Sequence, residues 1–556
     1  MPDPMTAPAP ARRPIPWKER AGWVAAAVAV LVYLPSVGGG FLYDDQQVIV
    51  DNRHIRDLGE IGTVLRYQPS RPLLNLTWAL NYAFSGLTAW PYHLVNVALH
   101  AGNAALLAGL FAWMGVRAGR SDPRGTALAG ACLFAATPMA AETVAYASSR
   151  STALATLLAL ASLRAAVPVL EGAGRRRLAA ALGFYVLALA SKEEALVAPL
   201  LLLLLDFFFV ARGEGREVVG RWRIHAPFLL LPVVAVAARR LATGAWLPPP
   251  ALPVERYLAT QTAAFPLYLL RALVPLDPAF YRAHPASPWP PDTATLVGAL
   301  LSVGLVAFAV LGRRRWPAAA LAVLWLGACL LPSSTVVPLK EMVVDHRAYL
   351  GGAGVAFAVG GWLWRPGRAP LLAGVVALLA ARAVHYEWVL ADPVRAWRDA
   401  VARAPRSAEA HFALGEAYAS RGDPRAEPAF RNAIALDAWD ARAWTNLGSF
   451  YVQTGRMGEA ERAMRGAARA SPLDSRIRNN LGLILLALGR EGEAVAQLEA
   501  AVAGQPPLAQ ARIDLAAVMV RRGRYERARS LLEEAAGMPL DPADDERLVS
   551  LQQQLP

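Results

Sequence analysis

Cysteine, lysine and charged side chains in general are scarce in this chain. The two cysteines, Cys132 and Cys329, both lie inside apolar runs, so there is no disulfide framework to expect. Only 18% of the 556 residues are charged, whereas 55% are hydrophobic. With a mean hydropathy of +0.31, this composition excludes an ordinary soluble globular protein and indicates a membrane protein.

Net positive charge is absent from the last part of the chain. Residues 391–556 carry as many acidic as basic side chains, so the whole excess of +13 lies in residues 1–390. There the excess comes from short arginine clusters between apolar runs, which is the distribution found in the cytoplasmic loops of membrane proteins. The charge therefore indicates membrane topology and not a nucleic-acid-binding patch.

Eleven apolar runs are expected to span the membrane once their flanking residues are included. They are residues 21–38, 94–115, 126–141, 151–170, 178–190, 195–211, 224–238, 293–312, 316–336, 349–364 and 369–386. Residues 1–20 form a proline-rich tail that we expect in the cytoplasm, and the first run is expected to be an uncleaved span. The membrane domain then covers residues 21–390.

A twelfth apolar run, residues 258–275, decides the topology of everything after it. It is broken by Pro266 and carries Arg271. If it does not cross, the arginines at 313–315, 365 and 368 lie on the cytoplasmic side with the earlier clusters. We therefore expect this run to lie along the membrane surface or to re-enter, and residues 391–556 to be extracytoplasmic.

This topology places polar residues from five external loops in one compartment. Arg239 lies near the same face, and the loops contribute Asp44, Asp45, Glu142, Lys192, Glu193, Lys340, Glu341, Asp345, His346 and Arg347. The catalytic candidates, which could take a proton from an acceptor, are Asp44, Asp45 and Glu142. The candidates for stabilising a departing lipid phosphate are the cations Lys192, Arg239, His346 and Arg347.

Plainer interpretations of these residues stay open. The Asp44-Asp45 pair fits a solvated loop, Lys192 with its acidic neighbours fits a turn that caps the next helix, and His346-Arg347 fits an anchor at the membrane interface. Glu142 is harder to explain without a role, because an acid in a short loop between two spans is costly unless it is paired or solvated.

The C-terminal residues 391–556 repeat with a period of 33 or 34. The repeated glycines are Gly415, Gly448 and Gly482 in one series and Gly422, Gly455, Gly489 and Gly523 in another. This pattern predicts tetratricopeptide repeats, at about residues 408–440, 441–474, 475–508 and 509–542, stacked as an α-solenoid. Residues 391–407 resemble a leading half-unit, and the polar tail 543–556 is suited to cap the stack. Asn446 and Asn480 are candidates for lining an acceptor-binding groove, with ordinary helix-surface polarity as the alternative.

Six stretches follow one another in a distinctive order along the chain: FLYDDQQVIVDN (41–52), SRPLLNLTWALNYAFSG (70–86), YHLVNVALHAGNAALL (92–107), ETVAYASSRSTALA (142–155), LALASKEEALVAPLLLLLLD (187–206) and PLKEMVVDHRAYLGGAG (338–354). Together they resemble one known family, the membrane-plus-tetratricopeptide protein O-mannosyltransferases of the GT-C glycosyltransferase superfamily. One departure is Thr137-Pro138, where related sequences usually have His-Pro, so no role of that histidine is carried over to this chain.

The resemblance implies transfer of a mannose-like sugar from a polyprenyl-phosphate-linked donor to protein hydroxyls on the extracytoplasmic face. It implies Asp44 and Asp45 as the catalytic pair and Glu142 as the acid that follows the proline of the second loop. The fold expected is all-α, a polytopic transmembrane bundle followed by the tetratricopeptide solenoid. The scarcity of lysine beside abundant arginine and alanine indicates a high-GC bacterium, hence an inner-membrane protein with periplasmic repeats.

Two other functions stay open. One is a non-catalytic membrane-anchored tetratricopeptide scaffold for envelope or secretion complexes, which has no use for converging acids. The other is a lipid-linked polysaccharide ligase or polymerase, which has no obvious use for a peptide-binding solenoid. The sequence does not indicate which sugar or acceptor is used, or whether a divalent cation such as Mg²⁺ or Mn²⁺ takes part.

Overall fold

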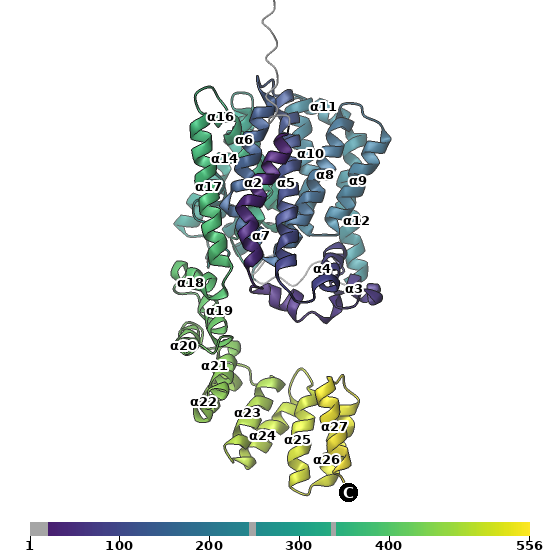
Figure 1. Ribbon diagram of the computed structural model, residues 1–556, viewed down its shortest axis with the longest axis vertical. Coiled ribbons are helices and arrows are strands. Elements are labelled where there is room, and N and C mark those ends of the chain that lie inside the picture. Colours follow the sequence, from purple (N-terminus) through teal and green to yellow (C-terminus); the bar gives the residue numbers. More distant parts are fainter. Residues whose placement is uncertain (1–19, 244–251, 335–340) are drawn as a thin grey trace, which may run out of the picture. The chain divides into compact units, whose positions relative to one another are not determined.

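The structure is a computed structural model that describes residues 20–243, 252–334 and 341–556 (Figure 1). These residues fold into helices, and the only strand-like pairing among them is an isolated bridge between Asp474 and Gln505. The chain divides into two compact units, Met1–Ala396 and Trp397–Pro556. The predicted all-α fold class is thus confirmed.

Among the described residues, the first helix of the first unit is α2 (Ala21–Tyr33), and a long connection follows that contains α3 (Ile61–Tyr67) and α4 (Pro72–Ser85). It continues with α5 (Trp90–Arg117), α6 (Pro123–Ala136), α7 (Ala141–Ala145), α8 (Arg150–Leu170), α9 (Arg175–Leu189), α10 (Ala198–Leu205), α11 (Gly215–Gly220) and α12 (Trp222–Thr243). The remaining helices are α13 (Val254–Leu273), α14 (Thr293–Gly312), α15 (Pro317–Ser334), α16 (Gly351–Leu363) and α17 (Ala369–Leu390). Among them, α17 contacts α2, α2 contacts α5, and α5 contacts α8, so these helices run side by side (Figure 1).

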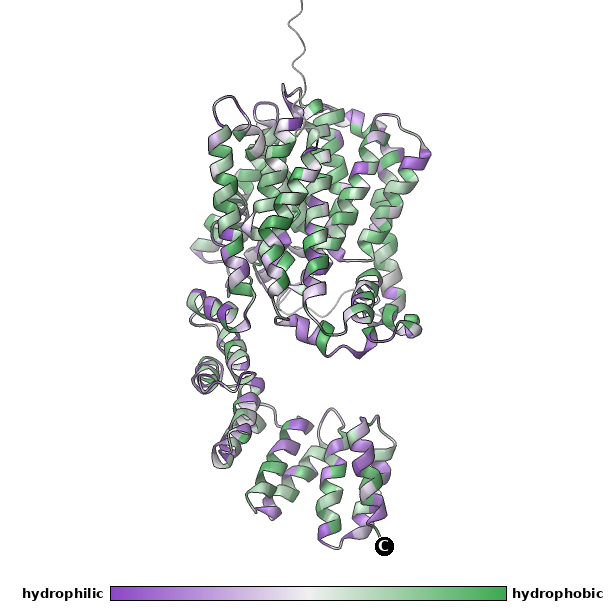
Figure 2. Ribbon diagram, viewed as in Figure 1, coloured by the Kyte–Doolittle hydropathy of each residue, from purple (hydrophilic) through white to green (hydrophobic). Residues whose placement is uncertain are grey.

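Six helices in the described part of the chain are long and apolar enough to cross a membrane, and a seventh is added if the bent pair Pro123–Ala136 and Pro138–Ala145 counts as one span. Figure 2 shows hydrophobic residues along the middle of these helices and hydrophilic residues toward their ends. The other expected spans correspond to shorter or proline-interrupted helices, α9, α10, α12 and α16. The number of eleven spans therefore stays a prediction.

Helices of this unit approach one another closely where glycines face each other. A Cβ atom added to Gly360 on α16 would lie 2.4 Å from the Gly130 nitrogen on α6. Small residues at such crossings allow close packing of helix backbones, which is the main source of helix association in lipid. This crossing lies near the C-terminal end of α16, whereas the start of α16, where the fifth loop ends, packs against Leu326 of α15 through Gly351.

α13 is the run that we expected not to cross, and it is not among the candidate spans. One of its faces is buried, and from that face the Tyr268 hydroxyl accepts a hydrogen bond from the Val344 N–H at 3.2 Å. Gln261 Nε2 donates to the Met342 carbonyl at 2.7 Å. α13 thus holds the loop that carries Glu341 and His346. Which side of a membrane the two ends of α13 face stays a prediction.

The second unit is a series of antiparallel helix pairs preceded by α18 (Pro393–Arg403). The helices are α19 (Ala408–Ala419), α20 (Ala426–Leu436), α21 (Ala441–Gln453), α22 (Met457–Ala470), α23 (Ser475–Ala487), α24 (Glu491–Ala503), α25 (Ala509–Arg521), α26 (Tyr525–Ala536) and α27 (Pro542–Gln553). The turn within each pair contains a glycine with positive φ, at Gly422, Gly455, Gly489 and Gly523. This left-handed conformation explains the conspicuous glycine period, because other residues adopt it only at a cost.

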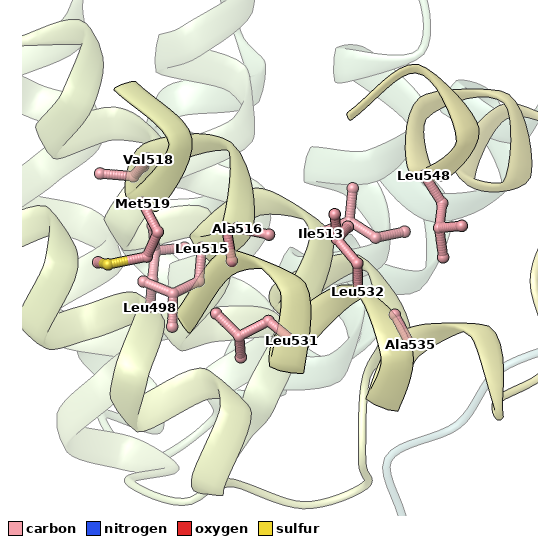
Figure 3. Close-up of a cluster of buried hydrophobic side chains, with 11 residues drawn as sticks. Leu498, Ile513, Leu515, Ala516, Val518, Met519, Leu531, Leu532, Ala535 and Leu548 are labelled. Atoms are coloured by element: carbon pink, nitrogen blue, oxygen red, sulfur yellow. The ribbon is translucent and has the colours of Figure 1, made fainter. Parts of the chain in front are cut away.

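The last repeat has a dense apolar core (Figure 3). Ile513 and Met519 of α25 pack there with Leu531 and Leu532 of α26. Leu548 of α27 joins the same cluster, so α27 covers an apolar face of the α25–α26 pair.

Candidate active site

The acid pair of the first external loop is split between two environments. Tyr43 has a positive φ of 51°, an uncommon conformation for a residue with a side chain, and it turns the backbone just before the pair. Asp45 is completely buried, whereas Asp44 is exposed. The carboxylate of Asp44 is therefore accessible to a substrate, whereas the carboxylate of Asp45 is not.

Asp45 links the first loop to the second. Its carboxylate accepts hydrogen bonds from the backbone N–H groups of Ser148 at 2.7 Å, Leu42 at 3.0 Å and Ala147 at 3.3 Å. Burial raises the pKa of Asp45 to about 7, and this effect outweighs the opposing effect of these donors. With its acceptor sites used by the backbone, Asp45 is placed to fix the shape of the loop.

Asp44 lies at the surface of the same loop. Its backbone N–H donates to the Tyr146 hydroxyl at 2.6 Å, which ties this residue to the second loop as well. An exposed carboxylate on a doubly anchored backbone is accessible to a substrate and fixed in position. Of the pair, Asp44 is the better candidate for a base.

Glu142 forms the closest side-chain contact between the second and fifth loops. Its Oε1 lies 2.6 Å from His346 Nδ1, and its Oε2 accepts the His346 backbone N–H at 3.2 Å. Glu142 is 6% exposed, so the pairing removes the cost of an otherwise isolated buried acid. The sequence argument that Glu142 needs a partner agrees with this contact.

Glu341 lies within electrostatic range of both candidate carboxylates. Burial raises the pKa of the Glu341 carboxyl, Glu142 and Asp44 raise it further, and His346 and Arg347 lower it. Asp44, Glu142, Glu341 and His346 therefore form one group of interacting charges, drawn from three loops that are far apart in the sequence.

The cations proposed to hold phosphate are largely engaged within the protein. Lys192 Nζ lies 2.8 Å from Glu194 and donates to the Thr152 hydroxyl at 2.7 Å. Arg347 donates to the Glu341 carbonyl at 2.8 Å and the Met342 carbonyl at 3.2 Å. The side chain of Arg239 and the whole of Lys340 lie outside the described residues.

Pairwise contacts link the five expected external loops to one another in series. The first loop contacts the third through Arg71 and Glu193, 2.6 Å apart, in addition to its contact with the second through Asp45. Thr152, Glu194, His346 and Arg347 line a single pocket, which brings the third loop beside the fifth. Asp345 of the fifth loop accepts the backbone N–H of Ala279 from the fourth at 3.0 Å.

Sequence reasoning missed the residues that hold this arrangement together. Arg150 is completely buried and donates to the Thr77 and Tyr92 carbonyls, each at 3.1 Å, and to Asn96 at 3.3 Å. Asn96 in turn donates to the Tyr146 carbonyl at 3.0 Å. The signal available in the sequence was the position of Arg150 at the start of an apolar run, inside the stretch ETVAYASSRSTALA. An arginine at that position is equally expected as an anchor at the membrane interface.

No group of three or more His, Cys, Asp or Glu side chains suited to hold a metal ion occurs in the described ranges. We therefore assign no ligands to the Mg²⁺ or Mn²⁺ ion that the sequence left open.

In the repeats, Asn446 is half-buried and donates to Glu416 at 2.9 Å, and Asn480 is half-buried on α23. Their part in binding an acceptor stays a prediction.

Fold and site together define the class of protein, a helical membrane protein with a cluster of loop carboxylates and a C-terminal series of tetratricopeptide repeats. The tetratricopeptide family model matches residues 391–424, 424–475, 451–509 and 479–545. Among solved structures, that of PilF from Pseudomonas aeruginosa is 24% identical, covers 29% of this chain and 79% of its own, and has a TM-score of 0.26. A score this low carries no further argument.

Curated relatives confirm the resemblance to the membrane-plus-tetratricopeptide O-mannosyltransferases. Protein O-mannosyl-transferase tmtc2 of Xenopus laevis is 38% identical over 100 residues, 16% of this chain and 12% of the relative. Protein O-mannosyl-transferase TMTC2 of Mus musculus is 36% identical over 153 residues, 25% of this chain and 18% of the relative. The matches thus span less than a fifth of either relative's own length.

Proposed function

We propose that this chain is an integral membrane glycosyltransferase that transfers a mannose-like sugar from a polyprenyl-phosphate-linked donor to protein hydroxyls. The observation that carries the proposal is the group of interacting charges formed by Asp44, Glu142, Glu341 and His346, which three loops far apart in the sequence bring together. The names of the relatives support the choice of sugar and of protein acceptors. A scaffold protein would gain nothing from holding several carboxylates together at the ends of its helices.

In the proposed reaction, the acceptor hydroxyl oxygen attacks C1 of the sugar and the bond between C1 and the phosphate oxygen breaks. The lipid phosphate leaves with the bonding electron pair, and Asp44 takes the hydroxyl proton. Glu142 holds His346 in a fixed orientation, as a carboxylate commonly does for a functional histidine. The buried position of Glu142 keeps the pair rigid.

The tetratricopeptide unit is proposed to bind the protein or peptide acceptor, with Asn446 and Asn480 as contacts. The placement of the arginine clusters supports extracytoplasmic repeats. The scarcity of lysine beside abundant arginine and alanine supports a bacterium, whose repeats would then lie in the periplasm. The five loops discussed above would then lie on the periplasmic side, where lipid-linked donors and exported proteins meet.

The proposal predicts that the purified full chain transfers radiolabelled mannose from polyprenyl-phosphate mannose to an exported protein of the same bacterium. Treatment with base releases sugars attached through serine or threonine by β-elimination, so release of the label in base identifies this linkage. A chain that binds membranes and folds, yet leaves both donor and acceptor unchanged across several polyprenyl-linked sugars, would favour the scaffold function.

A further inference from the structure

Arg164 is a charged side chain inside a candidate membrane span, and the chemistry proposed above does not use it. It lies six residues before the end of α8, within the candidate span Ala147–Leu170. An ionisable side chain inside a span is costly unless a partner meets it, so its position calls for a ligand or a function.

The guanidinium of Arg164 lies against a glycine of α5. A Cβ atom added to Gly109 would lie 3.0 Å from Arg164 Nε and 3.1 Å from its Nη2, so the missing side chain makes room for the charge. Seven residues earlier on both helices, a Cβ atom on Gly102 would lie 2.9 Å from Leu157 Cδ1. The two glycines therefore let side chains of α8 lie directly on α5, which runs beside it (Figure 1).

The hydrogen-bonding capacity of Arg164 is unused. Within the described ranges it has no hydrogen-bond or ion-pair partner. The acid that follows it on the same face of α8 is Glu171, seven residues and about 10 Å further along. Glu171 already binds Arg117 Nη2 at 2.6 Å and accepts from Trp113 Nε1 at 2.8 Å. The donors and the charge of Arg164 are therefore left for a ligand.

The charge is held below the lipid headgroups and stays accessible from outside. Gly109 lies eight residues before the end of α5 at Arg117, about 12 Å along the helix. One headgroup layer is only about 5–8 Å thick. Arg164 is half-buried, so part of it faces the surroundings expected to be lipid. A bilayer thins locally around an arginine at such a depth, which brings a lipid phosphate to it.

The charges at this end of α5 and α8 favour an anionic lipid over a zwitterionic one. The two connections there, residues 117–124 and 171–177, hold six arginines against two acids. Basic clusters between helices at the cytoplasmic side attract anionic headgroups, and this end is the one expected in the cytoplasm. Arginine suits a phosphate because its planar fork matches two of the oxygens.

We infer that Arg164 binds the phosphate of an anionic phospholipid against Gly109, between α5 and α8. At their opposite ends the same two helices are joined by Arg150 and Asn96, which lie 3.3 Å apart and support the second loop. The bound lipid joins the helices at the end away from that loop. It thereby stabilises the helix pair from which the candidate active site extends.

The test counts phosphatidylglycerol molecules retained by the purified full chain, using native mass spectrometry after release from nanodiscs of phosphatidylcholine with a minority of phosphatidylglycerol. The wild type should retain phosphatidylglycerol in preference to phosphatidylcholine. Arg164→Gln should lower the occupancy of one retained phosphatidylglycerol about tenfold or more, as loss of charge-assisted hydrogen bonds does. Gly109→Val should lower it too, because the added side chain displaces the guanidinium.

A matched control separates this site from general attraction to a basic surface. Arg177→Gln removes an exposed arginine from the start of α9, at the same end of the membrane unit, and should retain phosphatidylglycerol as the wild type does. Equal losses in Arg177→Gln and Arg164→Gln, or equal retention of phosphatidylcholine by the wild type, would overturn the inference. Unchanged retention in Arg164→Gln would overturn it as well.

Thermal unfolding in detergent separates binding from folding. Added phosphatidylglycerol should raise the melting temperature of the wild type, because a ligand that binds only the folded state stabilises it. It should leave the melting temperature of Arg164→Gln unchanged, and Arg164→Lys should recover part of the rise. Since neither measurement involves sugar transfer, the lipid site stands or falls independently of the proposed function.

Discussion

Replacing Asp44 with asparagine is expected to lower the rate of sugar transfer by about 10²–10⁴-fold, the usual contribution of a general base. Asparagine keeps the shape and much of the hydrogen bonding of aspartate but cannot take the proton of the acceptor hydroxyl. Because Asp44 is exposed, the melting temperature of the Asp44→Asn variant should match that of the wild type. The measurement is initial transfer rate together with thermal unfolding of the same preparation.

Two further variants of the same loop make this test specific. Asp51→Asn alters an exposed aspartate that pairs with Gln46 at 2.9 Å and should leave the transfer rate unchanged. Asp45→Asn should instead destabilise the chain by about 1–3 kcal/mol, because an amide nitrogen then faces backbone donors in a buried site. Full activity of Asp44→Asn would show that this acid belongs to a solvated loop.

Deleting residues 408–556 is expected to abolish transfer to a full-length protein while hydrolysis of the lipid donor continues. The physical reason is that solenoid repeats contact mainly their own neighbours, and the chain divides into separate compact units at Ala396. Transfer to a short peptide added in excess should survive, since a small acceptor does not need a docking surface.

The control for this deletion is a full-length variant with a single substitution in the repeats. Gly448→Leu should disturb one helix pair, because even a Cβ atom added at Gly448 would lie 3.0 Å from Met464 and the leucine side chain extends further. Transfer to the full-length protein should then fall with no loss of donor hydrolysis. Loss of donor hydrolysis in the deletion would instead make the repeats part of the catalytic fold.

Features with a strong local cause could be predicted from the sequence. The positive φ of Gly422, Gly455, Gly489 and Gly523 explains why a 34-residue period was visible at all. Long apolar runs gave α5, α8 and α14. The runs 195–211 and 349–364 were expected to span, but the helices α10 and α16 that they form are too short to be assigned as spans by length and composition.

The site could be predicted only in part. That Glu142 needs a partner followed from its place between two apolar runs, but the identity of His346 as that partner depends on how α7 and the fifth loop pack. The split of Asp44 from Asp45 arises from backbone groups at Ala147 and Ser148, which side-chain patterns do not show. Arg271 lay in a run whose topology was in question, so its ion pair with Asp345 could not be foreseen.

The most direct test of the central claim is mass spectrometry of exported proteins from cells with and without this chain. The account predicts hexose on serine or threonine of periplasmic proteins in cells that make the wild-type chain, and its loss when the gene is deleted. Restoring the Asp44→Asn variant should not bring the modification back, although the variant protein is present in the membrane. An unchanged set of glycosylated peptides in the deletion strain would contradict the account.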